Sequence, residues 1–424
     1  MLSFLLKGVI RDRARSVTPI IVTAVGVALT VIIYCWVSGT MNNIIESTAK
    51  FQTGHVKVMS RAYAAQSGEK PNDLAYIGVD SLLMTLESQF PEMAWLPRIH
   101  FGGLLDVPDA EGETRAQGPA FGMAIRLHDR DSGEREILNL HNSLVRGRLP
   151  ETSGEILVSE DFAEKLGVSL NETVTLLSTT MYGSLATYNF TITGTVKFGV
   201  IAMDRGAIIA DLADVQQALD MQNAAGEILG FFRKGFFEQH AAFDIANRFN
   251  AQFEKNEDEF APTMVTLRDQ DDLAQLLDTA AFGTAIIIGV FLAVMFMVLW
   301  NVGLISSIRR YGEIGVRLAI GEEKGHLYRL MLYESLIIGV IGSAIGTAIG
   351  LVFSYYLQNT GIDISSMMKN SSMMVSGVMR AQVKANSYFI GFIPGVLAIL
   401  LGTAVSGIGI YKRQTSQLFK ELEA

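Results

Sequence analysis

The sequence predicts an α-helical membrane protein with four transmembrane helices and a large α+β domain between the first and second helices. Hydrophobic residues make up 49% of the 424 residues and charged residues 18%, a balance too apolar for an ordinary soluble domain. Crossing a bilayer core takes about 20 apolar residues in a helix. Four stretches without charge reach that length, and a long polar segment separates the first two.

The membrane helices are predicted at 17–39 (first), 280–305 (second), 333–357 (third) and 388–410 (fourth). They leave five connecting segments: 1–16, 40–278, 306–332, 358–387 and 411–424. The apolar run of the first helix is longer than the core of a signal peptide, and no A-x-A-like cleavage site follows it. We therefore expect a retained signal anchor.

Lysine and arginine near the helix ends predict the orientation, because such residues concentrate in cytoplasmic loops. They precede the first helix, fill the connection between the second and third, and follow the fourth: Lys7, Arg11, Arg13, Arg15; Arg309, Arg310, Arg317, Lys324, Arg329; Lys412, Arg413, Lys420. Segments 1–16, 306–332 and 411–424 are thus expected in the cytoplasm. Segments 40–278 and 358–387 are expected outside.

The outer segment is acidic and without cysteine. Residues 42–278 carry 35 acidic and 19 basic side chains, a net charge of −16, which disfavours nucleic acid as a partner. The single cysteine, Cys35, falls inside the first predicted membrane helix. The outer domain must therefore be stable without disulfides, as its size allows.

Short apolar runs with β-branched residues predict strands in this segment: GHVKVMS, GEILVSE, ETVTLLST, FTITGTVKFG, RGAIIADL and APTMVTL. Helical patterns lie between them: VDSLLMTLESQF, SEDFAEKLG and LADVQQALDMQN. Ser159 and Gly167 bracket 160–166 as the N-cap and the C-terminal glycine of a short helix. A mixed α and β domain is expected.

Known catalytic and metal-binding patterns are missing from the sequence. There is no H-E-x-x-H pair and no G-x-S-x-G turn, and the acidic run Glu254–Phe260 is typical of a solvated surface. The dipeptide Gly-Lys, which a P-loop requires, occurs nowhere. The chain is therefore expected to be no enzyme and to bind no metal or cofactor. Any ATP and Mg²⁺ would be bound by another chain.

A charged helical segment, SSIRRYGEIGVRLAIGEEKGHLYRLMLYES at 306–335, joins the second and third membrane helices. Ile314 and Leu318 are four residues apart, Glu313 and Arg317 form an adjacent stripe, and Gly321 stands where a helix would end.

This segment resembles the cytoplasmic coupling segment of the FtsX-like, or type VII, ABC permeases, the family of MacB-like exporters and LolC/LolE-like lipoprotein-releasing permeases. The matching residues are Glu313, Ile314, Gly315, Val316, Arg317, Ala319, Gly321 and Glu334. The helix order and the outer motifs GHVKV, LVRGRLPETSGEILVSEDFAEKLGVSLNETVTLL and ITGTVKFG are also similar to the family.

The resemblance implies a permease subunit in the bacterial inner membrane that couples ATP hydrolysis by a separate ATPase dimer to release of lipid-anchored protein. It implies a second permease subunit, and a periplasmic domain with a porter-like part and a β-rich inserted part near 116–220. Seven residues would contact the ATPase: Arg310, Glu313, Ile314, Gly315, Arg317, Leu318 and Gly321. Ile314 and Leu318 would be the apolar knobs.

Two other functions stay open at this point. One is a MacB-like exporter that transmits motion to expel drugs or peptides, and the other is FtsX-like signalling to a cell-wall hydrolase outside. The chain begins without a fused ATPase, which favours the lipoprotein-releasing group. The stretch Ser178–Asn189, where that group has a hook for a periplasmic carrier, is short and lacks proline. Capture of a carrier or adaptor by this chain is therefore only one option.

The membrane helices contain three further candidate features. Gly342, Gly346 and Gly350 recur every four residues and predict a face for close helix packing, within the bundle or between subunits. Gly391 and Gly395 repeat the device, and Pro394 would bend the fourth helix. Bulky, adaptable side chains of the second helix would line a substrate cavity or face lipid: Phe291, Met295, Phe296 and Met297.

Two more features concern the helix ends. Glu334, near the cytoplasmic start of the third helix, needs a partner such as Arg329 or a helix N-terminus. The outer loop has a methionine-rich stretch, 365–380, for which a flexible apolar loop is a better interpretation than a copper(I) site, since no cysteine or histidine accompanies it.

Overall fold

The computed structural model describes residues 13–233, 237–270, 273–363 and 378–409. These residues form two compact units. One comprises 13–41, 279–362 and 379–409, and the other comprises 42–278 together with the short connection from 363. The methionine-rich stretch, apart from residues 378–380, lies outside the described residues. Four helical spans are long and apolar enough to cross a membrane, so the predicted fold class is confirmed.

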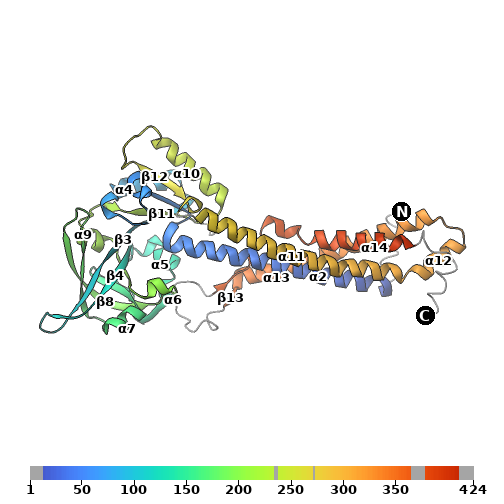
Figure 1. Ribbon diagram of the computed structural model, residues 1–424, viewed down its shortest axis with the longest axis horizontal. Coiled ribbons are helices and arrows are strands. Elements are labelled where there is room, and N and C mark those ends of the chain that lie inside the picture. The colour runs from blue at the N-terminus through green and yellow to red at the C-terminus, as the bar shows by residue number, and fades with distance from the viewer. Residues whose placement is uncertain (1–12, 234–236, 271–272, 364–377, 410–424) are drawn as a thin grey trace. The chain divides into compact units, whose positions relative to one another are not determined.

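The first unit is a helical bundle (Figure 1). Its helices are α2 (Arg13–Thr48), α11 (Leu273–Ile308), α13 (Lys324–Thr360) and α14 (Ile399–Gly407), and α12 (Tyr311–Ala319) connects α11 to α13. The predicted helices at 17–39, 280–305 and 333–357 lie inside α2, α11 and α13, which are longer. Strands β13 (Ile362–Asp363) and β14 (Val378–Met379) pair beyond α13.

The fourth predicted helix, 388–410, is not one regular α-helix. A 3₁₀ turn, η5 (Ala385–Tyr388), precedes a π-helical turn, η6 (Ile393–Ala398), which leads into α14. Pro394 stands at the start of η6. Because proline has no N–H and its ring clashes with the preceding turn, it disfavours regular α-helical hydrogen bonding at this point.

Close packing in the bundle depends on glycine. A Cβ atom on Gly342 would approach Thr23 to 2.7 Å, and one on Gly346 would lie 2.4 Å from the carbonyl oxygen of Ala24. The glycine face of α13 thus lies against α2, within one chain. Gly395 continues the same contact, since its Cβ would collide with Ser343 and Val27.

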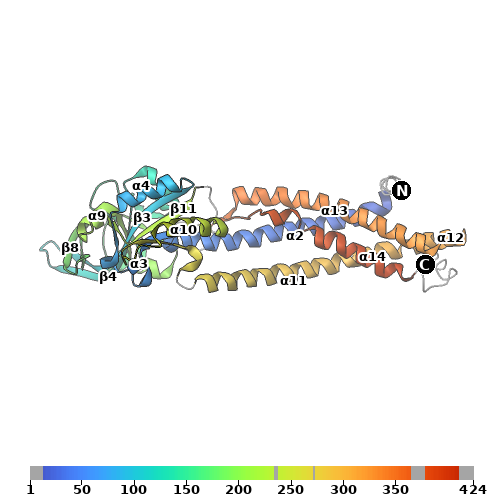
Figure 2. The same ribbon diagram turned by 90° about the horizontal axis from the view of Figure 1, so that it is seen from above.

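Helix α11 packs least. Only 11% of its most apolar 18-residue stretch is buried. The corresponding share is 44% for α2, 39% for α13 and 44% for the span Ala385–Gly407. Figure 2 shows α11 along one side of the bundle. Its buried contacts are few, chiefly Leu299 against Ala398 and Ile399. Most of its apolar surface therefore faces the surroundings of this chain.

The outer unit is built on a ten-stranded sheet, the largest among the described residues, with the order β12-β1-β11-β3-β4-β9-β6-β8-β5 and β7 paired with β3 and β8. The strands are β1 (Val56–Ser60), β3 (Met93–Pro108), β4 (Thr114–Ile125), β5 (Leu144–Gly147), β6 (Glu155–Ser159), β7 (Thr173–Thr179), β8 (Leu185–Val196), β9 (Ala207–Asp211), β11 (Glu227–Phe232) and β12 (Pro262–Thr266). A second small sheet pairs β2 (Tyr76–Ile77) with β10 (Ala224–Ala225).

Strand β3 belongs to two halves of the large sheet. Its residues 93–98 pair with β11, and its residues 99–108 pair with β4. The porter-like and inserted parts expected from the sequence therefore share one continuous sheet. The expected boundary at 116 falls inside β4, because the hairpin β3–β4 continues the sheet across it.

Helices cover the sheet of the outer unit: α3 (Arg61–Ala65), α4 (Val79–Gln89), α5 (Glu134–Ile137), α6 (Leu140–Ser143), α7 (Glu160–Leu166), α8 (Ile201–Asp204), α9 (Leu212–Ala218) and α10 (Gln239–Phe253), with short turns η2 (Asn72–Leu74), η3 (Arg130–Ser132) and η4 (Leu267–Asp269). Ser159 caps α7 by accepting the N–H of Phe162, and Gly167 ends it with φ of 64°. Both caps agree with the sequence prediction. Buried Leu86, Phe162 and Phe249 join one apolar core with residues of the sheet.

Candidate functional site

The connection between α11 and α13 is a compact, helical turn. Two residues, Arg309 and Arg310, separate the end of α11 from α12. Gly321 follows α12 with φ of 104°, a conformation that favours glycine. The chain then enters α13 at Lys324. The segment predicted as coupling helix is therefore α12 plus the first turns of α13.

One face of α12 is buried. Tyr311 and Ile314, each 5% exposed, form a cluster with Leu327 and Met331 of α13, and Leu318 packs partly against it. The hydroxyl of Tyr311 donates to the carbonyl oxygen of Ser406 on α14, at 2.5 Å. Gly315 is also buried. This face fixes α12 to the bundle.

The opposite face is exposed. Val316 is 40% and Ile320 is 80% exposed. Glu313 and Arg317 form an ion pair of 2.8 Å on the surface. Ile314, predicted as an apolar knob for a partner, is packed against α13 within this chain, and Leu318 is half-buried; their contact with an ATPase stays a prediction. The apolar side chains available for contact are those of Val316 and Ile320.

Arg310 does not point to the surface as a free contact residue. Its guanidinium pairs with the carboxylate of Glu334 on α13, and both side chains are mostly buried. The partner of Glu334 is thus Arg310, not the expected Arg329. A carboxylate that enters the membrane within a helix is costly without a partner, so this pair holds the connection between α11 and α13.

The four candidate cavity residues of α11 are not brought together. Met295 is buried, and the methyl of its thioether lies where a Cβ on Gly26 of α2 would clash. Phe291 and Phe296 are half-buried, and Met297 is 69% exposed. Only the exposed members of this set could contact a ligand arriving from the membrane.

The outer unit begins with the last turns of α2, which are tied into it by polar contacts. Glu46 accepts the N–H of Phe237 at 2.9 Å and contacts Nε2 of His55 at 3.2 Å. His55 in turn accepts the N–H of Phe232 through Nδ1. The end of α2 is thereby joined to β11 and to the chain before α10.

A buried arginine makes a second tie. Arg98, 0% exposed, stands on β3 at the residue where pairing changes from β11 to β4. It donates to the carbonyl oxygen of Lys50 at 2.7 Å, in the π-helical turn η1 (Ala49–Thr53) that follows α2, and to the carboxylate of Glu134 on α5 at 3.2 Å. Arg98 therefore joins α2 to both halves of the sheet.

A third buried charge, Glu227 on β11, meets three cationic or imidazole groups: Lys57 at 3.0 Å, Lys70, and His100 at 3.4 Å. Burial alone would raise the pKa of Glu227, but the bond with His100 and the charges of both lysines hold it well below its usual value. The sequence analysis missed Arg98 and Glu227. The available signal was a charge at an inward position of an apolar strand, which is rare unless paired.

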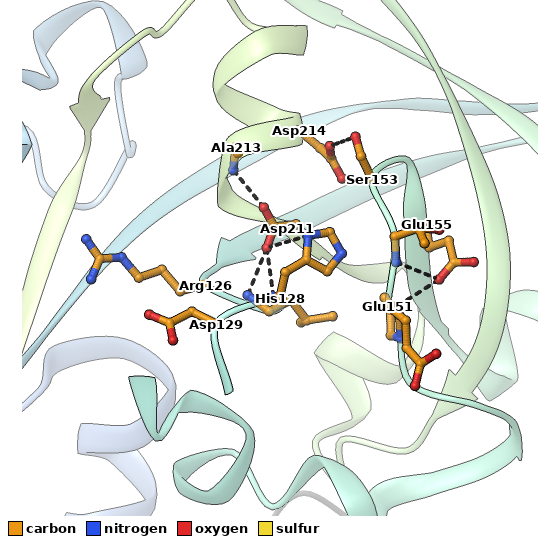
Figure 3. A network of polar contacts seen from close by, with 12 residues as sticks. Arg126, His128, Asp129, Glu151, Ser153, Glu155, Asp211, Ala213 and Asp214 are labelled. Atoms are coloured by element: carbon orange, nitrogen blue, oxygen red, sulfur yellow. Dashed lines mark hydrogen bonds and ion pairs between the residues drawn. The ribbon is translucent and has the colours of Figure 1, made fainter. Parts of the chain in front are cut away.

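The acidic residues around α9 have structural roles (Figure 3). Asp211 accepts the N–H groups of Leu127, His128 and Ala213, each at 3.0 Å. Asp214 accepts the hydroxyl of Ser153 and the N–H of Gly154. These carboxylates hold loops and cap α9. Among the described residues, no three His, Cys, Asp or Glu side chains are grouped as metal ligands.

The hairpin tip between β7 and β8 corresponds to the predicted hook region, Ser178–Asn189. Met181 is buried, and its N–H bonds to the carbonyl oxygen of Leu219. Tyr182 and Leu185 are 70% and 79% exposed. The tip is thus a short, anchored turn with two exposed apolar side chains.

Comparison with known proteins adds the family. The model of the FtsX-like permease C-terminal family matches residues 285–415, which include the connection around α12. Over this segment the chain is similar to the FtsX-like permeases. The matched region begins in α11 and includes α12, α13 and α14.

Individual relatives cover parts of the permease. The macrolide export ATP-binding/permease protein MacB of Neisseria meningitidis serogroup A is 30% identical over 110 residues, 24% of this chain and 17% of that protein. The lipoprotein-releasing system transmembrane protein LolC of Xylella fastidiosa is 22% identical over 261 residues, 59% of this chain and 60% of that protein. The chain thus spans less than two thirds of either relative.

One solved structure aligns with more than half of the permease. The periplasmic region of MacB from Actinobacillus actinomycetemcomitans covers 55% of this chain and 95% of its own, with 13% identity and a TM-score of 0.37. A likeness at this score does not bear on the function.

Proposed function

We propose that this permease couples ATP hydrolysis by a separate ATPase dimer to the extraction of lipid-anchored protein from the inner membrane. The proposal rests first on α12. Its buried face is fixed to α13 by Tyr311 and Ile314, while Val316 and Ile320 are exposed beside the Glu313–Arg317 pair. An exposed apolar pair with flanking charges is suited to a groove on a partner.

The output side of the mechanism is α2. This helix is continuous from Arg13 to Thr48, and its last turns and η1 carry the ties of Glu46 and Arg98 to the outer unit. In the proposed cycle, closure of the ATPase dimer tilts the bundle helices, and α2 carries the displacement into residues 49–53 and the sheet. The large domain then moves the cargo outward.

Cargo with acyl chains is proposed because α11 offers apolar surface that this chain does not cover. Met297 and Val290, 69% and 60% exposed, belong to that surface. The LolC relative, named for lipoprotein release, matches over 59% of this chain. A second permease subunit, the same chain or a related one, would complete the cavity beside α11.

A photo-crosslinking amino acid at Met297 of α11 tests the cargo. The matched control is Val352 of α13, which is equally apolar and 72% exposed. Acylated protein should be captured at position 297 and not at 352. Equal capture at both, or normal lipoprotein sorting after depletion of the permease, would contradict the lipoprotein proposal.

The second candidate is mechanical export of drugs or peptides, as the name of the MacB relatives describes for those proteins. It is favoured by their higher identity, 30% against 22%. In that case depletion would sensitise cells to the exported compound and leave lipoproteins sorted. Signalling to a cell-wall hydrolase would instead give a division or separation defect.

The orientation is tested with single thiols in a Cys35→Ser background. Glu322 beside α12 is exposed, and so is Tyr182 on the outer hairpin. An impermeant maleimide should label Tyr182→Cys in intact cells with a permeable outer membrane, and Glu322→Cys only after lysis. Labelling of Glu322→Cys before lysis would place the connection on the wrong side for an ATPase.

A further inference from the structure

The end of the bundle next to α12 contains a cavity of about 310 Å³ between α2 and α11. That volume is at the lower end of the range, roughly 300–1,000 Å³, of ligand pockets. Its walls are apolar except at one end: Thr18, Pro19, Val22, Val302, Ile305, Ser306, Arg309 and Arg310. None of the described lining residues is acidic.

The positive charge in the cavity is only partly neutralised. Arg310 pairs with Glu334. Arg309 is exposed and has no ion pair with any residue in the described part of the chain. One guanidinium, which offers five N–H donors in a planar fork, is thus available for an anion.

Hydroxyl groups add further donors. Ser306 lines the cavity itself. A smaller cavity of about 20 Å³, enough for one water, adjoins it and shares Pro19 and Arg310. Ser307 lines this smaller cavity; it is 3% exposed, and its Oγ has no hydrogen-bond partner among the described residues.

The position along the helix identifies the ligand class. Ile308 is the last residue of the charge-free stretch of α11, so Arg309 and Arg310 lie where the hydrocarbon core meets the headgroups. The apolar walls, Val22, Val302 and Ile305, lie along the helices toward the bilayer centre. The cavity therefore combines a cationic end with an apolar end.

We infer that this cavity is a binding site for an anionic phospholipid of the adjacent leaflet, with the phosphate at Arg309 and the Ser306 hydroxyl and an acyl chain against the apolar wall. Basic pockets between membrane helices are typical sites for anionic headgroups. A free phosphate ion shares the headgroup chemistry but leaves the apolar wall without a ligand. The inference does not depend on the cargo or on ATP coupling.

The test uses the full chain in lipid nanodiscs, released into detergent and analysed by native mass spectrometry. Phosphatidylglycerol should be retained in preference to phosphatidylcholine. Arg309→Gln should reduce that retention roughly tenfold, as expected for the loss of a charge-assisted contact. The matched control is Arg329→Gln, which removes the same charge from an exposed position on α13 outside the cavity, and it should retain the lipid.

Three results would overturn the inference. The first is equal loss of phosphatidylglycerol in both variants, which would indicate general surface charge. The second is no preference over phosphatidylcholine. The third is displacement of the retained lipid by excess inorganic phosphate, which would assign the site to a soluble anion. Ser306→Ala, at a residue that lines the cavity, serves as a second variant that keeps all charges and should weaken retention less than Arg309→Gln.

Discussion

Replacing Ile320 with aspartate tests the proposed contact of α12 with an ATPase. Ile320 is 80% exposed, so the change should alter the free energy of unfolding of the permease by no more than about 0.5 kcal/mol. If the side chain is buried on docking, about 1.5–3 kcal/mol of apolar burial is lost. Binding of the ATPase subunit should therefore weaken roughly 10- to 150-fold.

The comparison variant is Ile314→Ala, on the buried face of the same helix. Ile314 is 5% exposed, so its truncation should cost about 2–5 kcal/mol of stability by leaving a cavity. The two variants should thus separate: Ile320→Asp loses binding and keeps stability, whereas Ile314→Ala loses stability first.

The assay measures the Kd of the cognate ATP-binding subunit for nanodisc-embedded permease, together with the thermal unfolding midpoint. Leu185→Asp is the control, because Leu185 is equally exposed, at 79%, on the outer hairpin. It should leave both quantities unchanged. Binding by Ile320→Asp at the affinity of the unaltered permease would refute the assignment of the exposed face.

Three further predictions concern stability. Gly346→Ala should cost about 1–3 kcal/mol in detergent unfolding, since the new Cβ meets the backbone of α2 at 2.4 Å, whereas Gly289→Ala on α11, with open space around it, should not destabilise. Arg98→Met should lower the free energy of unfolding by about 3–5 kcal/mol, because it leaves Glu134 buried and unpaired. Adding Glu134→Leu should recover part of this loss. An unchanged thermal unfolding midpoint in Arg98→Met would contradict a stabilising role for the pair. The hydrogen bond from Arg148 lowers the pKa of Glu155 to about 2, below the usual value of about 4.3. The ionised carboxylate therefore stabilises the folded state fully above the usual pKa, and this stabilisation is lost as the pH falls through about 2. Glu155→Gln should accordingly flatten the dependence of the free energy of unfolding on pH between about pH 4 and 2.

The faces of α12 show why its exposed apolar residues were only half predictable. Ile314 and Leu318 are four residues apart, and so are Val316 and Ile320. A shift of two residues turns a helix by about 200°, so the segment has two apolar stripes on opposite sides. The sequence identifies both stripes but not which one faces α13. In the structure, the buried stripe is the one that includes Tyr311, whose hydroxyl bonds to Ser406.

The strands of the outer unit were predictable where their apolar pattern is uninterrupted, as in β1, β6 and β9. Strand β3 was missed because Pro97, Gly102 and Gly103 interrupt its pattern. The need for glycine at position 103 comes from a tertiary contact. A Cβ atom there would lie 2.4 Å from the carbonyl oxygen of Leu177 on β7. The neighbouring antiparallel strand β7, far along the chain, requires a glycine there, so no local window could explain it.

Helix α11 marks another limit of sequence reasoning. An apolar stretch without charge predicts a membrane helix from length alone. It does not distinguish lipid from protein as the neighbour, because both are apolar and helix association in bilayers depends on close packing. Glycine spacing did predict a close contact for α13 at Gly346, but no comparable spacing marks α11. The free surface of α11 therefore emerged only from the structure.

The buried pair Arg98–Glu134 is hard to explain by stability, because an apolar pair of the same volume is often as stable as a buried ion pair. One oxygen of Glu134 and one nitrogen of Arg98 also have no partner among the described residues. Its position offers a mechanical reason. Arg98 stands on β3 at the point where the two halves of the sheet meet, and it holds the carbonyl oxygen of Lys50. A displacement of residues 49–53 would then move both halves of the sheet together. Apolar side chains in place of the pair would let residues 49–53 shift without moving the sheet. If that is its role, the double variant Arg98→Met, Glu134→Leu should fold but transmit the ATPase cycle poorly to the outer sheet. Hydrogen exchange of the outer sheet, with and without nucleotide, would measure this transmission. Full transmission by the double variant would assign the pair to stability alone.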